Sequence, residues 1–172
     1  MTTTDDRWWD LVDRARREAE NAEPEARAVL LIDWLSRLEI GDIVAFDQFF
    51  LDRVNEAYRS DLWEVAYIMN GGCSDDGFDY FLGWLVSEGR HRYHAALSDP
   101  RAAADGVDPD DEPFECEAMW TVACRAFTAK TGQSDETYYE RYAPNVSRGP
   151  IGAPFDEETV AERHPELAAR FL

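Results

Sequence analysis

The sequence has 172 residues, of which 45% are hydrophobic and 13% aromatic, so it carries enough apolar side chains for the core of one domain. Its 36 acidic residues outnumber 17 basic ones, and the formal charge of −19 excludes a protein that binds a nucleic-acid backbone through its overall charge. We therefore expect no nucleic-acid partner. The acidic excess favours either a well-solvated surface or a surface that binds a basic protein.

The cysteines and the hydrophobic runs indicate a soluble protein of the cytoplasm. Cys73, Cys116 and Cys124 are odd in number and form no CxxC pair. The N-terminal residues lack the pattern of a signal peptide, in which basic residues precede an apolar run, and we expect no signal peptide. The longest uncharged apolar runs are far shorter than the roughly 20 residues that a membrane helix needs. We expect no membrane association, and the oligomeric state stays open.

Before Tyr58, three segments carry apolar residues at helical spacing. The first helix is predicted to begin at Thr4, the second at Pro24 and the third after Gly41. A shorter fourth helix follows over residues 60–69. The three apolar stripes are, in chain order, Trp8, Val12, Ala15 and Ala19; Leu31, Trp34, Leu35 and Leu38; and Ile43, Phe46, Phe50, Val54 and Ala57. Polar positions, such as Arg16 and Asp47, are expected to face water.

The stretch from Gly71 to Gly89 predicts a central core helix over residues 75–88. Ser74 lies where an N-cap is expected, and Asp75 and Asp76 follow in the first turn, where the helix dipole favours negative charge. Gly89 ends the helix. Its apolar positions are Phe78, Phe81, Leu82, Leu85 and Val86, with Tyr80 and Trp84 on the adjacent face.

The start of this helix supports two interpretations. In the first, Ser74 and the two aspartates are helix caps and Cys73 is a small buried residue. In the second, the helix N-terminus lowers the pKa of Cys73 and makes it a nucleophile.

On the catalytic interpretation, Cys73, Asp75 and Asp76 would react, with His91 or His94 as acid or base. His91 and His94 are three residues apart on one helical face, a spacing found in metal sites. Because Arg90 and Arg92 would repel a cation, we predict no metal, and no cofactor motif is present.

The second half of the chain alternates helices with irregular segments. Residues 98–113 read as an acidic loop, residues 115–131 as a helix ending at Gly132, and Ser134 as the cap of a short helix. Residues 143–155 are rich in proline and glycine and irregular. Residues 156–172 form a C-terminal helical segment broken at Pro165. The whole chain is predicted to be one compact all-α domain of about seven or eight helices, without β-strands.

Several stretches resemble a known family. The block GGCSDDGFDYFLGWLVSEGRHRYHAALSDP, residues 71–100, is similar to the signature of domain of unknown function 4240. The stretches RWWDLVDRAR, DLWEVAYIMNGG and HPELAARF also look like that family. The resemblance implies no established activity and no catalytic residues. Some relatives look fused to a WGR-type domain and carry a label linking them to molybdate regulation, and no such extra domain is expected here.

Two functional hypotheses follow. The first is a soluble acidic helical module for protein interaction or regulation, without catalysis, whose acidic surface binds a basic protein partner. The alternative is an enzyme with a site at the N-terminus of the 75–88 helix, using Cys73, Asp75 and Asp76 together with His91 and His94.

Overall fold

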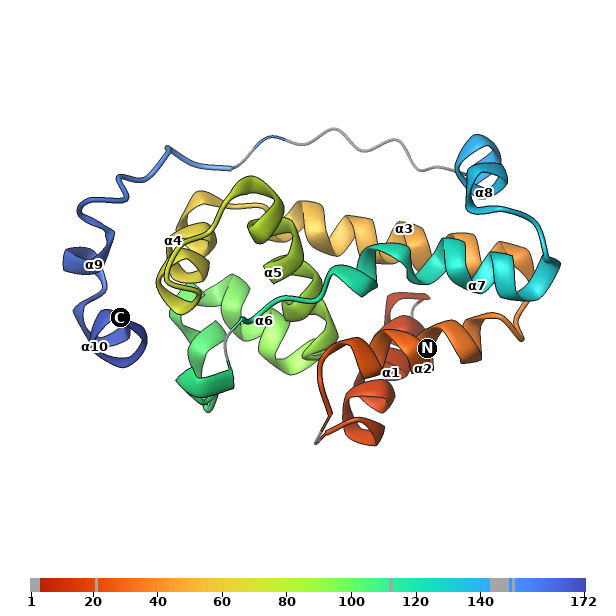
Figure 1. The fold of residues 1–172 in the computed structure, drawn as a ribbon, viewed down its shortest axis with the longest axis horizontal. Helices are drawn as coiled ribbons and strands as arrows, with labels where there is room; N and C mark the ends of the chain where they lie inside the picture. Colours follow the sequence, from red (N-terminus) through yellow and green to blue (C-terminus); the bar gives the residue numbers. More distant parts are fainter. Residues whose placement is uncertain (1–3, 21, 112, 143–148, 150) are drawn as a thin grey trace.

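A computed structural model describes residues 4–20, 22–111, 113–142, 149 and 151–172. Over these residues the chain forms α-helices and 3₁₀ helices and no β-strand, which confirms the all-α prediction (Figure 1). An isolated parallel bridge joins Arg59 to Ile151. The α-helices are α1 (Thr4–Glu18), α2 (Glu25–Leu35), α3 (Ile40–Ala57), α4 (Ser60–Met69), α5 (Asp75–Ser87), α6 (Arg90–Ser98), α7 (Val122–Thr131), α8 (Asp135–Tyr142), α9 (Val160–Arg163) and α10 (Pro165–Phe171). The 3₁₀ helices are η1 (Pro100–Ala104), η2 (Pro109–Asp111) and η3 (Glu117–Thr121).

These ten α-helices in the described ranges exceed the predicted seven or eight. The C-terminal segment divides at His164 into α9 and α10, because Pro165 has no backbone N–H to continue the first helix. Pro165 is instead accommodated in the first turn of α10, where an N–H is not needed.

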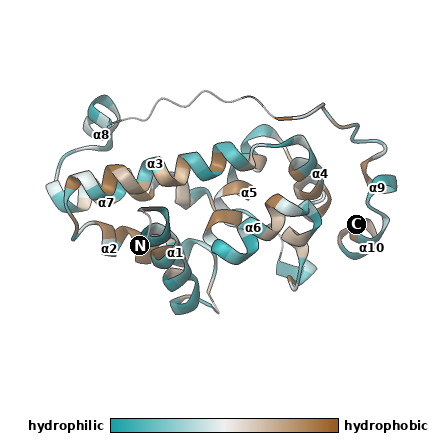
Figure 2. Ribbon diagram, turned by 180° about the vertical axis from the view of Figure 1, so that it is seen from behind, coloured by the Kyte–Doolittle hydropathy of each residue, from teal (hydrophilic) through white to brown (hydrophobic). Residues whose placement is uncertain are grey.

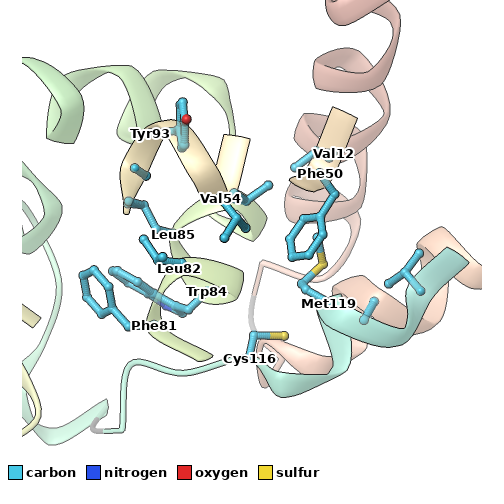
Figure 3. Packing of buried hydrophobic residues seen from close by; sticks show 14 of the residues in the cluster. Val12, Phe50, Val54, Phe81, Leu82, Trp84, Leu85, Tyr93, Cys116 and Met119 are labelled. Carbon is cyan, nitrogen blue, oxygen red and sulfur yellow. The ribbon is translucent and has the colours of Figure 1, made fainter. Parts of the chain in front are cut away.

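Helix α5 lies at the centre of the core. Ser74 caps it by accepting a hydrogen bond from the backbone N–H of Gly77 at 3.2 Å, and Gly89 follows its end with a φ of +94°. Every side chain from Phe81 to Ser87 is buried. In the close-up, residues of α5 pack with Val54 of α3 and with Met119 of η3 (Figure 3). The predicted central helix is therefore the element on which the other helices pack.

The apolar stripes predicted for α1 and α3 are fully buried. The ring of Trp8 packs edge-on against Phe46 at 5.7 Å, and Trp9 packs edge-on against Phe49 at 5.1 Å, so aromatic pairs join the two helices. In Figure 2 hydrophobic and hydrophilic turns alternate along α3 and α7, as expected for helices with one face in the core.

The predicted helix over residues 115–131 is divided into η3 and α7. The backbone N–H of Cys116 donates to the carbonyl of Tyr80 in α5 at 2.9 Å, which holds this segment against α5 before α7 begins. The close approach is possible because residue 83 is glycine: a Cβ there would lie 2.5 Å from the carbonyl oxygen of Cys116. The tertiary contact with α5, which spacing alone does not reveal, sets where the regular helix starts.

The segment predicted as an acidic loop, residues 98–113, contains η1 and η2. Ala103 and Ala104 of η1 are fully buried, and the guanidinium of Arg92 donates to the carbonyls of Ala103 at 2.8 Å and Asp105 at 2.7 Å. The N-terminal part of this segment is thus packed against the helices, while its aspartates remain at the surface.

The last helices lie at opposite ends of the molecule (Figure 1). Helix α8 packs on α7, and the Tyr138 hydroxyl donates to Asp47 of α3 at 2.7 Å. Asp47 is half-buried rather than facing water as expected, and this burial raises its pKa. Helices α9 and α10 pack on α4.

Most of the predicted irregular stretch at residues 143–155 lies outside the described residues. In its described part, the carbonyl of Ile151 accepts a hydrogen bond from the backbone N–H of Ser60 at 2.9 Å, which holds the chain beside α4. Measured over the part of the chain that is described, none of the helices combines the length and the apolar character required to span a bilayer.

Candidate functional site

The structure places Cys73 just before α5, half-buried beside Ser74 and Gly77. The indole N–H of Trp63 donates to its backbone carbonyl at 2.9 Å. Burial, with the nearby negative charge of Glu115, raises the pKa of the Cys73 thiol to about 12. The environment therefore disfavours the thiolate, which agrees with the interpretation of Cys73 as a buried residue and not with the catalytic interpretation.

The other residues of the catalytic hypothesis divide between the two ends of α5. Asp75 and Asp76 are exposed in its first turn. His91 and His94 are exposed in α6, which begins after α5 ends, and the His94 ring lies 5.6 Å from Trp9. Thirteen helical residues rise about 20 Å, so α5 separates the aspartates from the start of α6. Within the described ranges, no three His, Cys, Asp or Glu side chains are grouped to hold a metal ion.

Cys73 is expected to react slowly with a thiol reagent in the folded protein. With a pKa of about 12, only about one thiol in ten thousand is ionised at pH 8, and the labelling rate should rise with pH without a plateau below pH 10. Peptide mass spectrometry after timed labelling measures this rate at each cysteine. The urea-unfolded chain is the control and should show an ordinary thiol pKa of about 8.5. Rapid labelling of Cys73 at pH 7 would contradict this result and support a nucleophilic role.

A cleft of about 910 Å³ is lined in part by Tyr80 and Trp84 of α5. Its lining residues come from α1, the segment joining α1 to α2, α2, α5, α6 and two stretches at residues 106–111 and 113–117. Its lining residues are Arg16, Glu20, Ala22, Glu23, Pro24, Glu25, Arg27, Tyr80, Trp84, Glu88, Arg92, Gly106, Val107, Asp110, Asp111, Pro113, Phe114, Glu115 and Glu117. The cleft joins segments that are far apart in sequence.

Three arginines, Arg16, Arg27 and Arg92, surround one carboxylate in this cleft, and we call them the arginine floor. Glu88 Oε1 accepts from Arg27 Nη1 at 2.5 Å, and Glu88 Oε2 accepts from Arg92 Nε at 3.1 Å and from Arg16 Nε at 3.4 Å. Arg27 also donates to Ser87 Oγ at 3.1 Å. Since the arginines come from α1, α2 and α6 and Glu88 follows α5, these contacts tie four helices together.

In the arginine floor Arg27 and Arg92 are largely buried, and the three guanidinium groups outnumber the one carboxylate that they contact. The side chains of Glu88 and Arg27 are only 7% and 9% exposed, and that of Arg92 is 15% exposed. Among the described residues Glu88 is the one carboxylate paired with the three arginines, which leaves two positive charges unbalanced by direct contact. The buried Nε of Arg27 has no hydrogen-bond partner in the same part of the chain. Buried polar groups are usually hydrogen-bonded, to protein or to ordered water, so this N–H has room for one more acceptor.

Seven further carboxylates line the same cleft, and we call them the acidic rim: Glu20, Glu23, Glu25, Asp110, Asp111, Glu115 and Glu117. Their negative potential acts on neighbouring groups. The charge of Glu117 raises the pKa of the Tyr80 hydroxyl, and burial and the charge of Glu117 raise the pKa of Glu115. The acidic rim therefore favours cations, whereas the arginine floor favours anions.

Aromatic side chains also line the cleft. Trp84 is buried, with its ring edge-on to Phe114 at 5.4 Å, and the Arg92 guanidinium lies 5.9 Å from the Trp84 ring. Tyr80 lies one turn earlier on α5. The cleft thus offers apolar contact area as well as both signs of charge, the combination typical of binding sites.

Sequence reasoning missed this cleft, although two local signals point to it. Glu88 falls seven residues after Phe81 and three after Leu85, in register with the apolar stripe of α5. Arg27 falls four residues before Leu31 and eight before Leu35, in register with the stripe of α2. A charged residue in such a stripe is buried and needs a charged partner. Arg16, expected to face water, supplies part of that partnership.

A smaller cavity of about 520 Å³ lies between η1 and α10. Its arginines are already engaged: Arg101 pairs with Asp99 at 2.8 Å, Arg163 with Glu64 at 3.1 Å, and Arg170 donates to backbone carbonyls of residues 104 and 107. These contacts fasten the C-terminal helices to the domain. We therefore take the larger cleft as the candidate functional site.

Comparison with known proteins gives a family match and no function. The family model described as "Protein of unknown function (DUF4240)" matches residues 1–129. No curated protein and no solved structure gives a significant match. The matched residues include the whole lining of the cleft, from Arg16 to Glu117, and exclude α9 and α10.

Proposed function

We propose that this chain, which belongs to the DUF4240 family of proteins of unknown function, is a non-catalytic interaction module. In this proposal its acidic rim binds a basic segment of a partner protein. The observation that carries the proposal is the presence of seven carboxylates in the lining of one cleft. Carboxylates spread evenly over a surface mainly confer solubility, whereas a concave acidic site attracts and orients a cationic ligand.

The position of the cleft supports the same proposal. All of its lining residues fall within the part of the chain that the family model matches. Helices α9 and α10, which border the smaller cavity, do not. A binding role for the family is therefore better assigned to the cleft than to the smaller cavity.

Among the residues that the structure describes, the contacts do not favour the catalytic alternative. Cys73 has a thiol pKa of about 12, and His91 and His94 lie beyond the other end of α5. We further propose that the module acts in the cytoplasm, because its three cysteines are free, as is usual in a reducing compartment.

The proposal is tested by measuring how a basic probe binds when the acidic rim is neutralised. The probe is a fluorescent hexalysine peptide with an amidated C-terminus, titrated by anisotropy at physiological ionic strength. The triple variant Glu20→Gln, Glu23→Gln, Asp110→Asn removes three exposed carboxylates of the acidic rim. If each contributes about 0.5 kcal/mol, binding should weaken roughly tenfold.

A matched variant separates a local site from overall charge. Glu39→Gln, Glu136→Gln, Glu140→Gln removes the same number of exposed carboxylates from positions that do not line the cleft. Its affinity for the probe should change less than twofold. Equal weakening in both triple variants would mean that the probe responds only to net charge, and the proposed function would then be abandoned.

A further inference from the structure

The arginine floor contains more positive charge than an acidic protein needs for packing alone. One carboxylate and three guanidinium groups meet in the cleft, inside a chain whose formal charge is −19. Structural pairing with Glu88 accounts for one of the three positive charges. Because Arg92 also donates to the backbone carbonyls of Ala103 and Asp105, the remaining positive charge in the cleft is mainly that of Arg16 and Arg27.

We infer that the arginine floor is an oxyanion-binding site, which takes a carboxylate or phosphate group carried by the same ligand whose basic groups lie against the acidic rim. The ligand of the cleft would then be zwitterionic, for example a basic peptide that ends in a free carboxylate. The inference rests on the proposed function for the cationic part of this ligand. It assigns to the same ligand an anionic group, which the acidic rim alone would repel.

The chemistry of the three side chains supports this ligand class. Guanidinium groups present paired N–H donors that match the oxygen atoms of carboxylate and phosphate. Arg16 uses its Nε on Glu88 and is 41% exposed, so its terminal nitrogens have access to the cleft. The Nε of Arg27, in a side chain more than nine-tenths buried, has no partner within the described residues. An oxyanion beside the guanidinium groups of Arg16 and Arg27 would supply further acceptors and balance their charge.

The test compares two peptides that differ only at the C-terminus: fluorescent hexalysine as the free acid and as the amide. Without an oxyanion site, the free acid should bind equally or more weakly, because its extra negative charge is repelled by an acidic protein. With the arginine floor as a site, the free acid should bind about fivefold more tightly than the amide. Equal or weaker binding of the free acid would overturn the inference.

Two single variants identify the side chain responsible. Arg16→Gln removes one charge of the arginine floor and leaves Glu88 paired with Arg27 and Arg92, so the fold is preserved. Arg17→Gln removes the same charge from the adjacent exposed position. The preference for the free acid should fall to less than about twofold in Arg16→Gln and stay near fivefold in Arg17→Gln. Retention of the full preference in Arg16→Gln would contradict the assignment.

Competition with small anions distinguishes the two oxyanions. Sodium phosphate and sodium acetate are added at equal ionic strength, and the anion that weakens free-acid binding more is the class that the arginine floor prefers. If neither acts beyond sodium chloride, the inference fails. The acidic rim is tested separately with the amide peptide. The proposed function can therefore fail while the preference for the free acid stands, and the preference can be absent while the acidic rim still binds the amide.

Discussion

Replacing Glu88 with glutamine is expected to lower the free energy of unfolding by about 3–5 kcal/mol, because it leaves buried guanidinium groups without their counter-charge. Glu88 is 7% exposed and accepts hydrogen bonds from all three arginines of the arginine floor. The melting temperature should fall by about 10 °C for a chain of this size. Urea unfolding monitored by circular dichroism gives the free energy directly.

An exposed ion pair provides the control for this substitution. Glu18 pairs with Arg14 at 2.8 Å, with both side chains about half exposed, and Glu18→Gln should change stability by less than about 1 kcal/mol. A comparably small loss in Glu88→Gln would mean that the stability of the four helices does not depend on this carboxylate.

The same variant can be tested with an anion. Phosphate should raise the melting temperature of Glu88→Gln more than that of the original protein, because it replaces the lost negative charge.

Gly83→Ala is expected to cost about 2–4 kcal/mol, because the added methyl group has no space. Its Cβ would lie 2.5 Å from the carbonyl oxygen of Cys116, which is backbone and can move only by displacing η3 from α5. That displacement would also break the hydrogen bond from the Cys116 N–H to the Tyr80 carbonyl. The measurement is again the free energy of unfolding in urea.

Gly77 offers a matched comparison one and a half turns earlier in the same helix. A Cβ at residue 77 would meet its nearest atom, Ser74 Oγ, at 3.4 Å, an ordinary contact. Gly77→Ala should therefore be neutral or stabilise the protein by up to about 1 kcal/mol, through the better helix propensity of alanine. If the two alanine variants were equally stable, the close packing of α5 against residue 116 would be wrong.

The sequence predicts α5 well because the signals for it are local. The Ser74 cap, the apolar spacing from Phe78 to Val86 and the glycine at residue 89 are all read within one segment, and the structure confirms each. The sequence pattern is less informative where a contact with a residue far away in the sequence decides the conformation. The bond between Cys116 and Tyr80 shortens the regular part of the predicted 115–131 helix, and Tyr138 partly covers an aspartate expected to face water.

The cleft was not predictable in the same way, because its charged residues come from α1, α2 and α6, from the connections after α1 and α5, and from residues 110, 111, 115 and 117. Sequence spacing brought Cys73, Asp75 and Asp76 together and suggested His91 and His94 as partners, but the length of α5 lies between the two groups. What the sequence did contain was the register of Glu88 and Arg27 with apolar stripes. That register marks each residue as buried, but only the fold shows that they meet.

The most direct test of the account is a crystal structure of the protein with the free-acid lysine peptide. We predict that the peptide lies in the cleft, with its terminal carboxylate within hydrogen-bond distance of Arg16 or Arg27 and its ammonium groups near the acidic rim. A peptide bound elsewhere, such as in the smaller cavity beside His164 and Arg170, would contradict the assignment of the cleft as the functional site.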